Sequence, residues 1–284
     1  MPFIKLDNFF TECADAIRLK REKSDKILPE NMANEIRSIV SKPPTQSGEY
    51  YHLVENENKS TISAYGITFY GSFLADRLKN DAQIKEVICL SDITSTPENF
   101  LYNTSLMEKV FFYGDIETFG KNSFYNSTVS EIILPNGEIN KIPEKVTVIP
   151  EYCFYLCPNL SNITLHDGIT DIGPYAFQLS AYGLSIGSTE LPASLKTIGN
   201  ASFYYQQIPL TEIPASVTSI GSQAFYQNLA LNSLTFKGKP TTINSTAFSY
   251  CTNLKTINVP WAEGAVSGAP WGATNATINY NYTS

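Results

Sequence analysis

The sequence predicts an α+β repeat protein, in which a solenoid of stacked units with short parallel strands follows a short two-helix N-terminal segment. Three observations lead to this prediction. A phenylalanine motif recurs at intervals of 22 to 30 residues, a small residue precedes each copy, and short apolar stretches with the pattern of strands follow it. The 284 residues are 43% hydrophobic and 17% charged, a composition typical of extensive packed surface rather than disorder.

The recurring motif is an apolar residue, then four others, then an anchor phenylalanine. The anchors are Phe124, Phe154, Phe177, Phe203, Phe225 and Phe248, and we interpret Phe100 as a further, degenerate copy. The residue before each anchor is small: Ser123, Cys153, Ala176, Ser202, Ala224 and Ala247. A position restricted to small side chains indicates close backbone approach inside a packed coil.

Apolar residues after each anchor predict short strands. A leucine recurs at Leu160, Leu184, Leu210, Leu231 and Leu254, and a second apolar residue follows three positions later in most copies, at Ile163, Ile213, Leu234 and Ile257. A unit of about 23 residues cannot bury its apolar side alone. The units must therefore stack.

This pattern resembles the BspA-type (Treponema-type) leucine-rich repeat. The segments Ile220-Gly-Ser-Gln-Ala-Phe225 and Ala247-Phe248-Ser-Tyr-Cys251-Thr-Asn-Leu254 carry the resemblance most closely. It covers about residues 93–260 and implies a leucine-rich-repeat solenoid. The departures are a longer unit between Phe124 and Phe154 and an insert at 181–190, and we expect both to bulge as loops.

The repeat also explains most of the cysteines. Cys157 and Cys251 each lie three residues after an anchor phenylalanine, and Cys153 occupies the small-residue position. Although Cys153 and Cys157 are close in sequence, no histidine accompanies them, and two thiols make a poor metal site. We expect buried structural thiols, no metal and no cofactor.

The N-terminal segment predicts two amphipathic helices. One apolar face comprises Phe9, Phe10, Cys13 and Ile17, and the other comprises Met32, Ile36 and Ile39. Two short helices cannot bury an independent core, so these faces are expected to attach to another protein or to a copy of the chain. We divide the chain into an attachment or oligomerisation segment (1–42), a linker and N-terminal cap (43–92), the solenoid (93–260) and a C-terminal cap (261–284).

Both ends of the chain resemble segments of tail and baseplate proteins of phages and prophages of Firmicutes. The N-terminal resemblance runs through Ala14-Asp-Ala-Ile-Arg18 and Ser24-Asp-Lys-Ile27, and the C-terminal one through Trp261 and Trp271. It implies a virion-tail location after synthesis in the host cytoplasm, with other tail proteins as partners of residues 1–42. The alternative is generic capping sequence on a protein of the bacterial cell surface.

Charge and hydropathy narrow the class of partner. The net charge is −7, and the part after residue 42 is acidic, which disfavours nucleic acid. No apolar run approaches the ~18 residues of a membrane helix, so membrane insertion is not expected. The first residues also lack the pattern of a secretory signal, which we take to count against a bacterial surface protein.

The sequence contains no recognisable constellation of catalytic residues. The two histidines are His52 and His166, and we expect His166 to be a solvated turn residue. No nucleophile elbow, phosphate loop or zinc helix is present. We therefore predict that the protein is not an enzyme.

Two surfaces are candidates for ligand binding. A tyrosine ladder follows the anchors at Tyr125, Tyr155, Tyr204 and Tyr226, with Gln178 between them, and we include Tyr250 of the last unit. These rings either bind sugars or a protein partner, or simply stack on one another to cover the coil edge. The second candidate is the strand face at Thr164, Thr235 and Asn258.

The predicted function is that of a non-enzymatic, tail-associated phage or prophage adhesin. In this hypothesis the solenoid recognises a glycan or protein of the bacterial surface. The alternatives are a bacterial surface or host-interaction leucine-rich-repeat protein and a purely structural component of a tail or baseplate.

Overall fold

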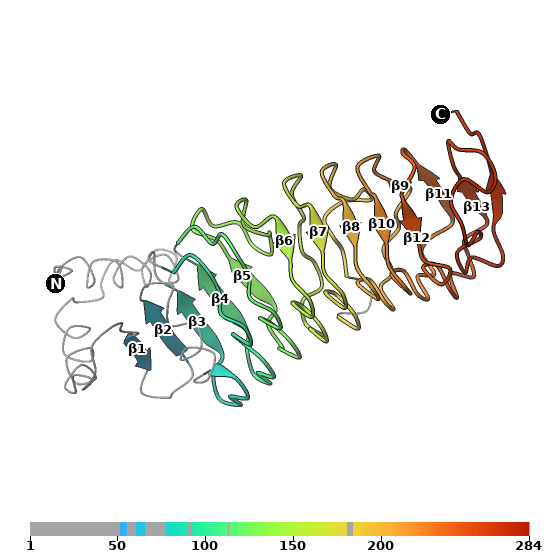
Figure 1. Ribbon diagram of the computed structural model, residues 1–284. Helices are drawn as coiled ribbons and strands as arrows, with labels where there is room; N and C mark the ends of the chain where they lie inside the picture. Colours follow the sequence, from blue (N-terminus) through green and yellow to red (C-terminus); the bar gives the residue numbers. More distant parts are fainter. Residues whose placement is uncertain are drawn as a thin grey trace.

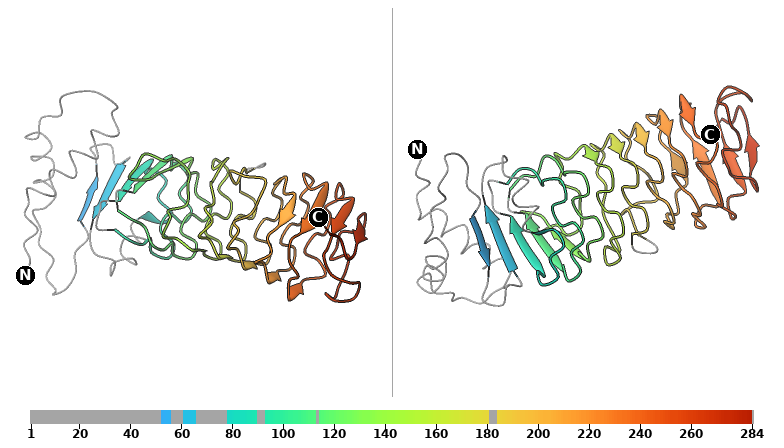
Figure 2. Two further views of the ribbon diagram at one scale, coloured as in Figure 1. Left: turned by 90° about the horizontal axis from the view of Figure 1, so that it is seen from above. Right: turned by 60° about the horizontal axis from the view of Figure 1, so that its bottom comes forward.

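The computed structural model describes residues 52–55, 61–65, 78–89, 93–112, 114–180 and 184–283. The predicted helices, with Phe9, Phe10, Cys13, Ile17, Met32, Ile36 and Ile39, lie outside these residues. The described part is a solenoid whose coils follow one another along a single long axis, from β1 at one end to β13 near the other (Figures 1 and 2).

Two strand positions recur in the coils. The longer strands form an N-terminal sheet of β1 (His52–Glu55), β2 (Thr61–Tyr65), β3 (Glu86–Cys89), β4 (Lys109–Phe112) and β5 (Glu131–Ile133). Strands at the same position of the coil form a C-terminal sheet, in the order β14 (Thr277–Asn279), β13 (Thr256–Asn258), β11 (Ser233–Phe236) and β9 (Glu212–Ile213), of which β9 has only two residues. All of these pairings are parallel except that between β1 and β2.

The shorter strands precede the anchor phenylalanines and form a second face. Their order is β12 (Thr242–Ile243), β10 (Ser219–Ile220), β8 (Thr197–Ile198), β7 (Asp171–Ile172) and β6 (Val148–Ile149), and all pairings are parallel. The isoleucine of each strand is paired with the isoleucine of the next, so the apolar side chains align from coil to coil.

The anchor phenylalanines form a continuous stack through the core. Phe124, Phe154, Phe177, Phe203, Phe225 and Phe248 are each fully buried, and consecutive ring centroids lie 5.0 to 5.5 Å apart. The small residues before them are buried as well. The prediction of a stacked repeat with buried anchors is therefore confirmed.

The prediction of an α+β class is wrong for the described residues, which form a β-solenoid with turns between the strands and contain no complete helix. Residues on both sides of an anchor explain this. Tyr152 and Leu156, two positions before and after Phe154, have φ of 56° and 51°, and the same pair of positions is left-handed in most coils. Left-handed residues interrupt a helix after less than one turn.

The same turns join neighbouring coils. The N–H of Leu156 donates to the carbonyl oxygen of Gln178 at 3.0 Å, and the N–H of Phe154 donates to Ala176 at 2.8 Å. The left-handed conformation thus turns the backbone donors towards the next coil instead of along a helix.

The hydrogen bonds between coils show that the predicted anchor Phe100 is displaced by one residue. The N–H of Leu101 donates to the carbonyl oxygen of Ser123 at 2.6 Å, as the N–H of Phe124 donates to Cys153 at 2.8 Å. Leu101 therefore occupies the anchor position, and Phe100 occupies the position that is small in the other coils. The ring of Phe100 is buried and meets Phe124 edge to face at 6.1 Å.

Candidate binding surface

The tyrosines that follow the anchors form two stacked columns on one edge of the solenoid. In the first, Tyr125 lies between Tyr102 and Tyr155, with ring centroids 4.6 and 4.7 Å away and interplanar angles of 9° and 16°. In the second, Tyr204 and Tyr226 stack at 4.4 Å and 7°. These rings are half-buried. Because their faces cover one another, they present ring edges and hydroxyl groups to solvent.

A second row of tyrosines runs beside the first column. Tyr152 and Tyr175 stack at 4.6 Å and 6°, and Tyr152 meets Tyr125 at 6.0 Å and Tyr155 at 5.4 Å. Sequence reasoning missed this row, because Tyr152 and Tyr175 lie before their anchors and not after them. The predicted ladder is thus a broader aromatic surface than one residue per coil.

Tyr250 occupies a different place from the one predicted. The N–H of Gln227 donates to the carbonyl oxygen of Ser249 at 2.9 Å, as the N–H of Tyr205 donates to Tyr226 at 2.9 Å. Ser249 therefore holds the ladder position, and Tyr250 lies one residue further along. Its ring lies 4.9 Å from that of Tyr226 but is tilted by 48°, and the residue is 64% exposed. Tyr250 consequently leaves most of its ring free.

Tyr125 and Tyr204 hold their hydroxyl protons more tightly than a free tyrosine does. Burial, and then the neighbouring Tyr155, raises the pKa of Tyr125 above its ordinary value of 10.0. Burial, and then Tyr226, raises the pKa of Tyr204 in the same way. These two residues therefore offer neutral phenols that can both donate and accept hydrogen bonds.

The strand face brings together two of its three predicted residues. Thr235 and Asn258 are partners in the pairing of β11 with β13, and the Asn258 amide donates to the Thr235 hydroxyl at 3.1 Å. The Asn279 amide in turn donates to the Oδ1 atom of Asn258 at 2.8 Å. Thr164 is exposed and pairs with Lys141 in a separate bridge. Because Asn258 is largely buried and bonded within the sheet, this face offers less to a ligand than the tyrosine edge.

The repeat cysteines are internal hydrogen-bond donors. The Cys157 thiol donates to the Phe124 carbonyl oxygen at 2.9 Å, and the Cys251 thiol donates to that of Phe225 at 3.0 Å. Burial raises the pKa of Cys157 to about 12 and that of Cys251 to about 11. These thiols are buried and serve the structure, as predicted.

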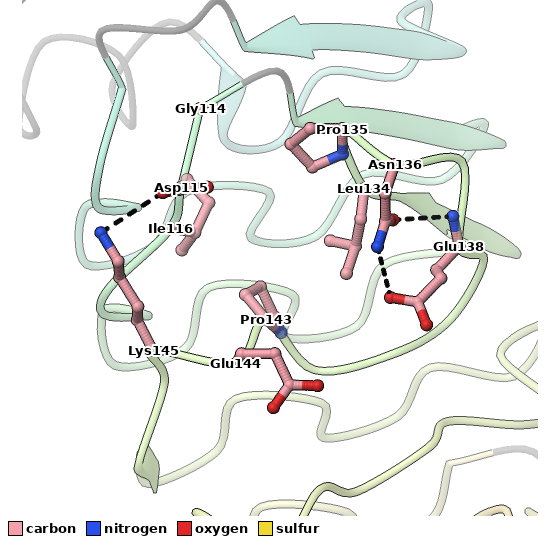
Figure 3. A pocket seen from close by; sticks show the side chains of 10 residues that line it. All are labelled: Gly114, Asp115, Ile116, Leu134, Pro135, Asn136, Glu138, Pro143, Glu144 and Lys145. Atoms are coloured by element: carbon pink, nitrogen blue, oxygen red, sulfur yellow. Dashed lines mark hydrogen bonds and ion pairs between the residues drawn. The ribbon is translucent and has the colours of Figure 1, made fainter.

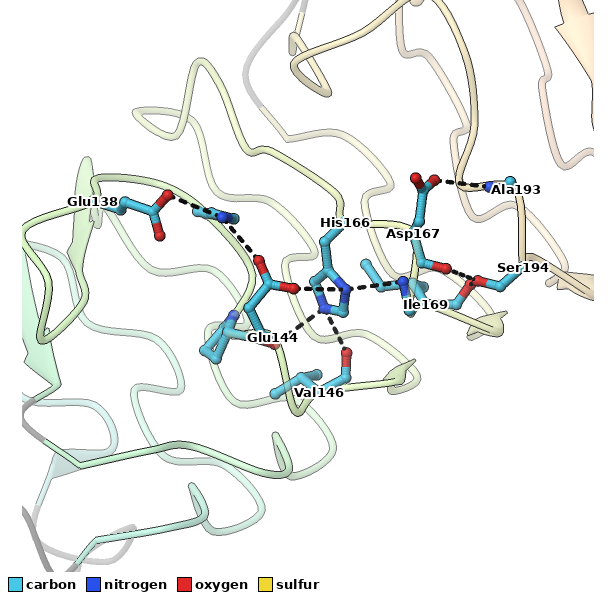
Figure 4. Close-up of polar contacts among 11 residues, drawn as sticks. Glu138, Glu144, Val146, His166, Asp167, Ile169, Ala193 and Ser194 are labelled. Atoms are coloured by element: carbon cyan, nitrogen blue, oxygen red, sulfur yellow. Dashed lines mark hydrogen bonds and ion pairs between the residues drawn. The ribbon is translucent and has the colours of Figure 1, made fainter.

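His166 joins its own coil to the preceding one instead of lying in solvent (Figure 4). Its side chain is only 7% exposed. The N–H of Gly168 donates to Nδ1 at 3.0 Å, so the hydrogen-bond pattern places the ring proton on Nε2, which lies 3.1 Å from the carbonyl oxygens of Pro143 and Val146. The adjacent Asp167 accepts a hydrogen bond from the N–H of Ala193 in the following coil, at 3.1 Å. The expectation of a solvated turn residue is therefore wrong.

Each departure from the regular repeat is accompanied by a cavity. The longer unit contributes to a cavity of about 220 Å³, lined by Gly114, Asp115, Ile116, Leu134, Pro135, Asn136, Glu138, Pro143, Glu144 and Lys145 (Figure 3). The insert contributes to one of about 290 Å³, lined by Glu190, Leu191, Ala193, Glu212, Pro214, Ala215 and Ser216. The sequence indicated the irregular units but not the cavities.

Two further findings concern the described residues alone. Within them, no group of three or more histidine, cysteine, aspartate or glutamate side chains is arranged to hold a metal ion. A helix long and apolar enough to cross a membrane is also not found in that part of the chain.

Comparison with solved structures finds leucine-rich-repeat proteins from bacteria. A leucine-rich cell surface protein from Faecalibacterium prausnitzii is 17% identical over 77% of this chain and 71% of its own, with a TM-score of 0.48. The leucine-rich-repeat protein of T. pallidum is 20% identical over 77% of this chain and 85% of its own (TM-score 0.39). One from Bacteroides ovatus is 15% identical over 84% and 76% (TM-score 0.40). No curated protein matches the sequence.

The repeat itself matches a family model. The model of the BspA-type leucine-rich-repeat region matches in six copies, over residues 74–146 and 180–263. These two stretches make up more than half of the 284 residues. The protein therefore belongs to the BspA-type leucine-rich-repeat family.

Proposed function

We propose that this protein is a non-enzymatic binding protein of the bacterial surface type, and that its partner contacts the tyrosine edge of the solenoid. The observation that carries this proposal is the exposure of Tyr250 beside the column of Tyr204 and Tyr226. A tyrosine residue that is 64% exposed offers an apolar ring face and a hydroxyl group to a sugar or a protein.

Three properties of this edge support binding. The stacked rings hold one another in place, so a partner orders few side chains when it binds. The edge continues over several coils, which gives an extended contact surface of the kind that solenoids offer. The phenols of Tyr125 and Tyr204 remain protonated and can donate hydrogen bonds to a partner, since burial raises the pKa of both.

Catalysis has less support. The thiols of Cys153, Cys157 and Cys251 are buried, and burial raises the pKa of each, so they hold their protons and lie out of reach of a substrate. The ring of His166 is held by backbone groups of its own turn and of the preceding coil. Neither group is free to act as a nucleophile or a base.

Binding is tested with the full chain in two formats. Fluorescently labelled protein is incubated with whole bacterial cells, and in parallel with an array of immobilised bacterial and host glycans. The proposal expects saturable binding in at least one format, which an excess of unlabelled protein displaces. Signal that rises linearly and resists displacement in both formats would contradict it.

A second candidate, a phage or prophage tail adhesin, rests on the resemblance of the terminal segments 1–42 and 261–284 to tail and baseplate proteins. A structural tail component without adhesion is a further form of the same hypothesis. An antibody against the chain tests both, because either requires the protein in purified tail particles. If the protein is absent from such particles and is recovered on the bacterial surface, both tail hypotheses are excluded and the surface-protein proposal remains.

A further inference from the structure

One wall of the cavity in the longer unit is formed by a hairpin that the stacking of the coils does not require. Residues 134–138 form a tight hairpin turn, in which the N–H of Leu134 donates to Glu138 and the N–H of Gly137 donates to Leu134, both at 2.9 Å. An antiparallel bridge between Ile133 and Ile139 closes the hairpin within a stack of parallel strands. Among the described residues from β6 to β14, all strand pairings are parallel and no other hairpin of this kind is found, so stacking alone does not account for it.

The floor of this cavity is apolar. Ile116 is 1% and Leu134 is 7% exposed, and Pro143 is also buried (Figure 3). The three residues come from neighbouring coils. The volume of about 220 Å³ is smaller than the ~300–1,000 Å³ of sites for drug-sized ligands. The cavity therefore suits one long side chain better than a complete small molecule.

The rim of the cavity carries an excess of negative charge. The Lys145 ammonium lies 3.4 Å from Asp115 and 3.3 Å from Glu117. The Lys141 ammonium lies 2.9 Å from Glu138 and 2.8 Å from Glu144. The lining itself holds three carboxylates, of Asp115, Glu138 and Glu144, and one ammonium group, of Lys145, whereas Glu117 and Lys141 lie outside it. The side chains of Asp115 and Glu144 are 75% and 66% exposed.

We propose that this cavity binds a single lysine side chain of a protein partner. The aliphatic stem lies on the floor of Ile116, Leu134 and Pro143, and the ammonium group lies at the rim between Asp115 and Glu144. Lysine combines an apolar stem with a compact charge. The carboxylates come from separate turns, which suits a point charge better than the paired oxygens that an arginine fork prefers.

This inference does not depend on the tyrosine edge. The cavity lies between the loops 114–116 and 143–145 and the hairpin 134–138, and no tyrosine of the columns lines it. The Tyr250→Ala variant should therefore bind a lysine probe as the wild type does. Failure of one proposal leaves the other standing.

The probe is Nα-acetyl-lysine methyl amide, titrated into the isotope-labelled full chain and followed by NMR. We expect saturable shifts of the Ile116 and Leu134 methyl groups, with a dissociation constant on the order of 1 mM. Nα-acetyl-norleucine methyl amide has a similar stem without the charge, and its affinity should be lower by a factor of about five or more. Salt should weaken the lysine probe alone.

Two variants locate the charge, and one controls for it. Asp115→Asn and Glu144→Gln should each weaken the lysine probe about two- to fivefold and leave norleucine unaffected. Glu190→Gln, at the second cavity, should change the affinity of neither the lysine probe nor the norleucine probe. Equal affinities of lysine and norleucine, or unchanged lysine binding in both variants, would overturn the proposal. Tighter binding of the corresponding arginine amide would overturn the choice of lysine.

Discussion

The thiol of Cys157 donates a hydrogen bond to the main-chain carbonyl oxygen of Phe124, 2.9 Å away in the preceding coil. The equivalent Ser180 hydroxyl donates to the carbonyl oxygen of Phe154, and the equivalent Cys251 thiol donates to that of Phe225. The residue three positions after the anchor thus links its coil to the one before. Gln206 makes the equivalent bond with its side-chain amide, which donates to the carbonyl oxygen of Phe177 at 2.9 Å. Cysteine, serine and glutamine can all occupy this position because each supplies a buried donor.

Replacing this donor should destabilise the protein. Cys157→Ala removes a buried hydrogen bond to Phe124 and should lower the free energy of unfolding by about 1–2 kcal/mol. Cys157→Ser retains a donor of similar size and should cost less than Cys157→Ala. Urea denaturation followed by circular dichroism measures both. Equal loss in the two variants would show that the volume of the sulfur atom matters and not its hydrogen bond.

Stability should fall at alkaline pH. Burial raises the pKa of Cys157 from its ordinary value of 9.0 to about 12, and that of Cys251 to about 11. The folded state therefore holds these protons more tightly than the unfolded chain does. Their contribution is complete below pH 9 and is lost as the pH rises towards 12. The denaturation midpoint should fall over this interval.

The matched control for the alkaline loss is the double variant Cys157→Ser, Cys251→Ser. Serine does not titrate in this range, so the midpoint should fall less steeply between pH 9 and 12. An identical slope in wild type and variant would assign the loss to other groups, first the buried Cys153 and then the half-buried Tyr125 and Tyr204.

A methyl group at Gly199 should disrupt stacking. A Cβ atom there would lie 2.6 Å from the backbone of Gly173 in the preceding coil, so Gly199→Ala forces two coils apart. We expect it to lower the free energy of unfolding by about 2 kcal/mol or more. Gly264 has φ of +80° and open space around it. Gly264→Ala should cost only about 1 kcal/mol, through backbone strain. Thermal melting of the two variants compares them, and the reverse ranking would contradict this packing.

Loss of the His166 ring should loosen the contact between its own coil and the preceding one. His166→Ala removes the bonds to Pro143, Val146 and Gly168 from a side chain that is 7% exposed, and we expect a loss of about 1–3 kcal/mol. Hydrogen exchange should then accelerate around these three backbone groups. Unchanged exchange there would mean that the ring does not fasten the turns.

The stack of anchors could be predicted because it depends on one position that repeats along the chain. Phe154, Phe177 and Phe203 each follow a small residue, and any regular coil aligns such positions. The turns could not be predicted in this way. Left-handed residues are usually glycine or asparagine, whereas here Tyr152 and Leu156 adopt this conformation, which inter-coil hydrogen bonds stabilise.

The candidate surfaces were predicted less completely. The sequence identified Tyr125, Tyr155, Tyr204 and Tyr226, but the spacing of coils decides that their faces close on one another. A shift of one residue moved Tyr250 out of the column and left it exposed. The cavity depends on the approach of Asp115 to Lys145, which are 30 positions apart, and a repeat pattern carries no such information.

The central claim is that the tyrosine edge binds the partner, and saturation binding to bacterial cells tests it most directly. The full-length wild type is compared with Tyr250→Ala and with Tyr282→Ala, which removes another exposed tyrosine, 39% exposed and outside the edge. We predict that Tyr250→Ala lowers the affinity about fivefold or more, while Tyr282→Ala stays within about twofold of wild type. Equal binding by Tyr250→Ala and wild type, at equal melting temperatures, would contradict the account.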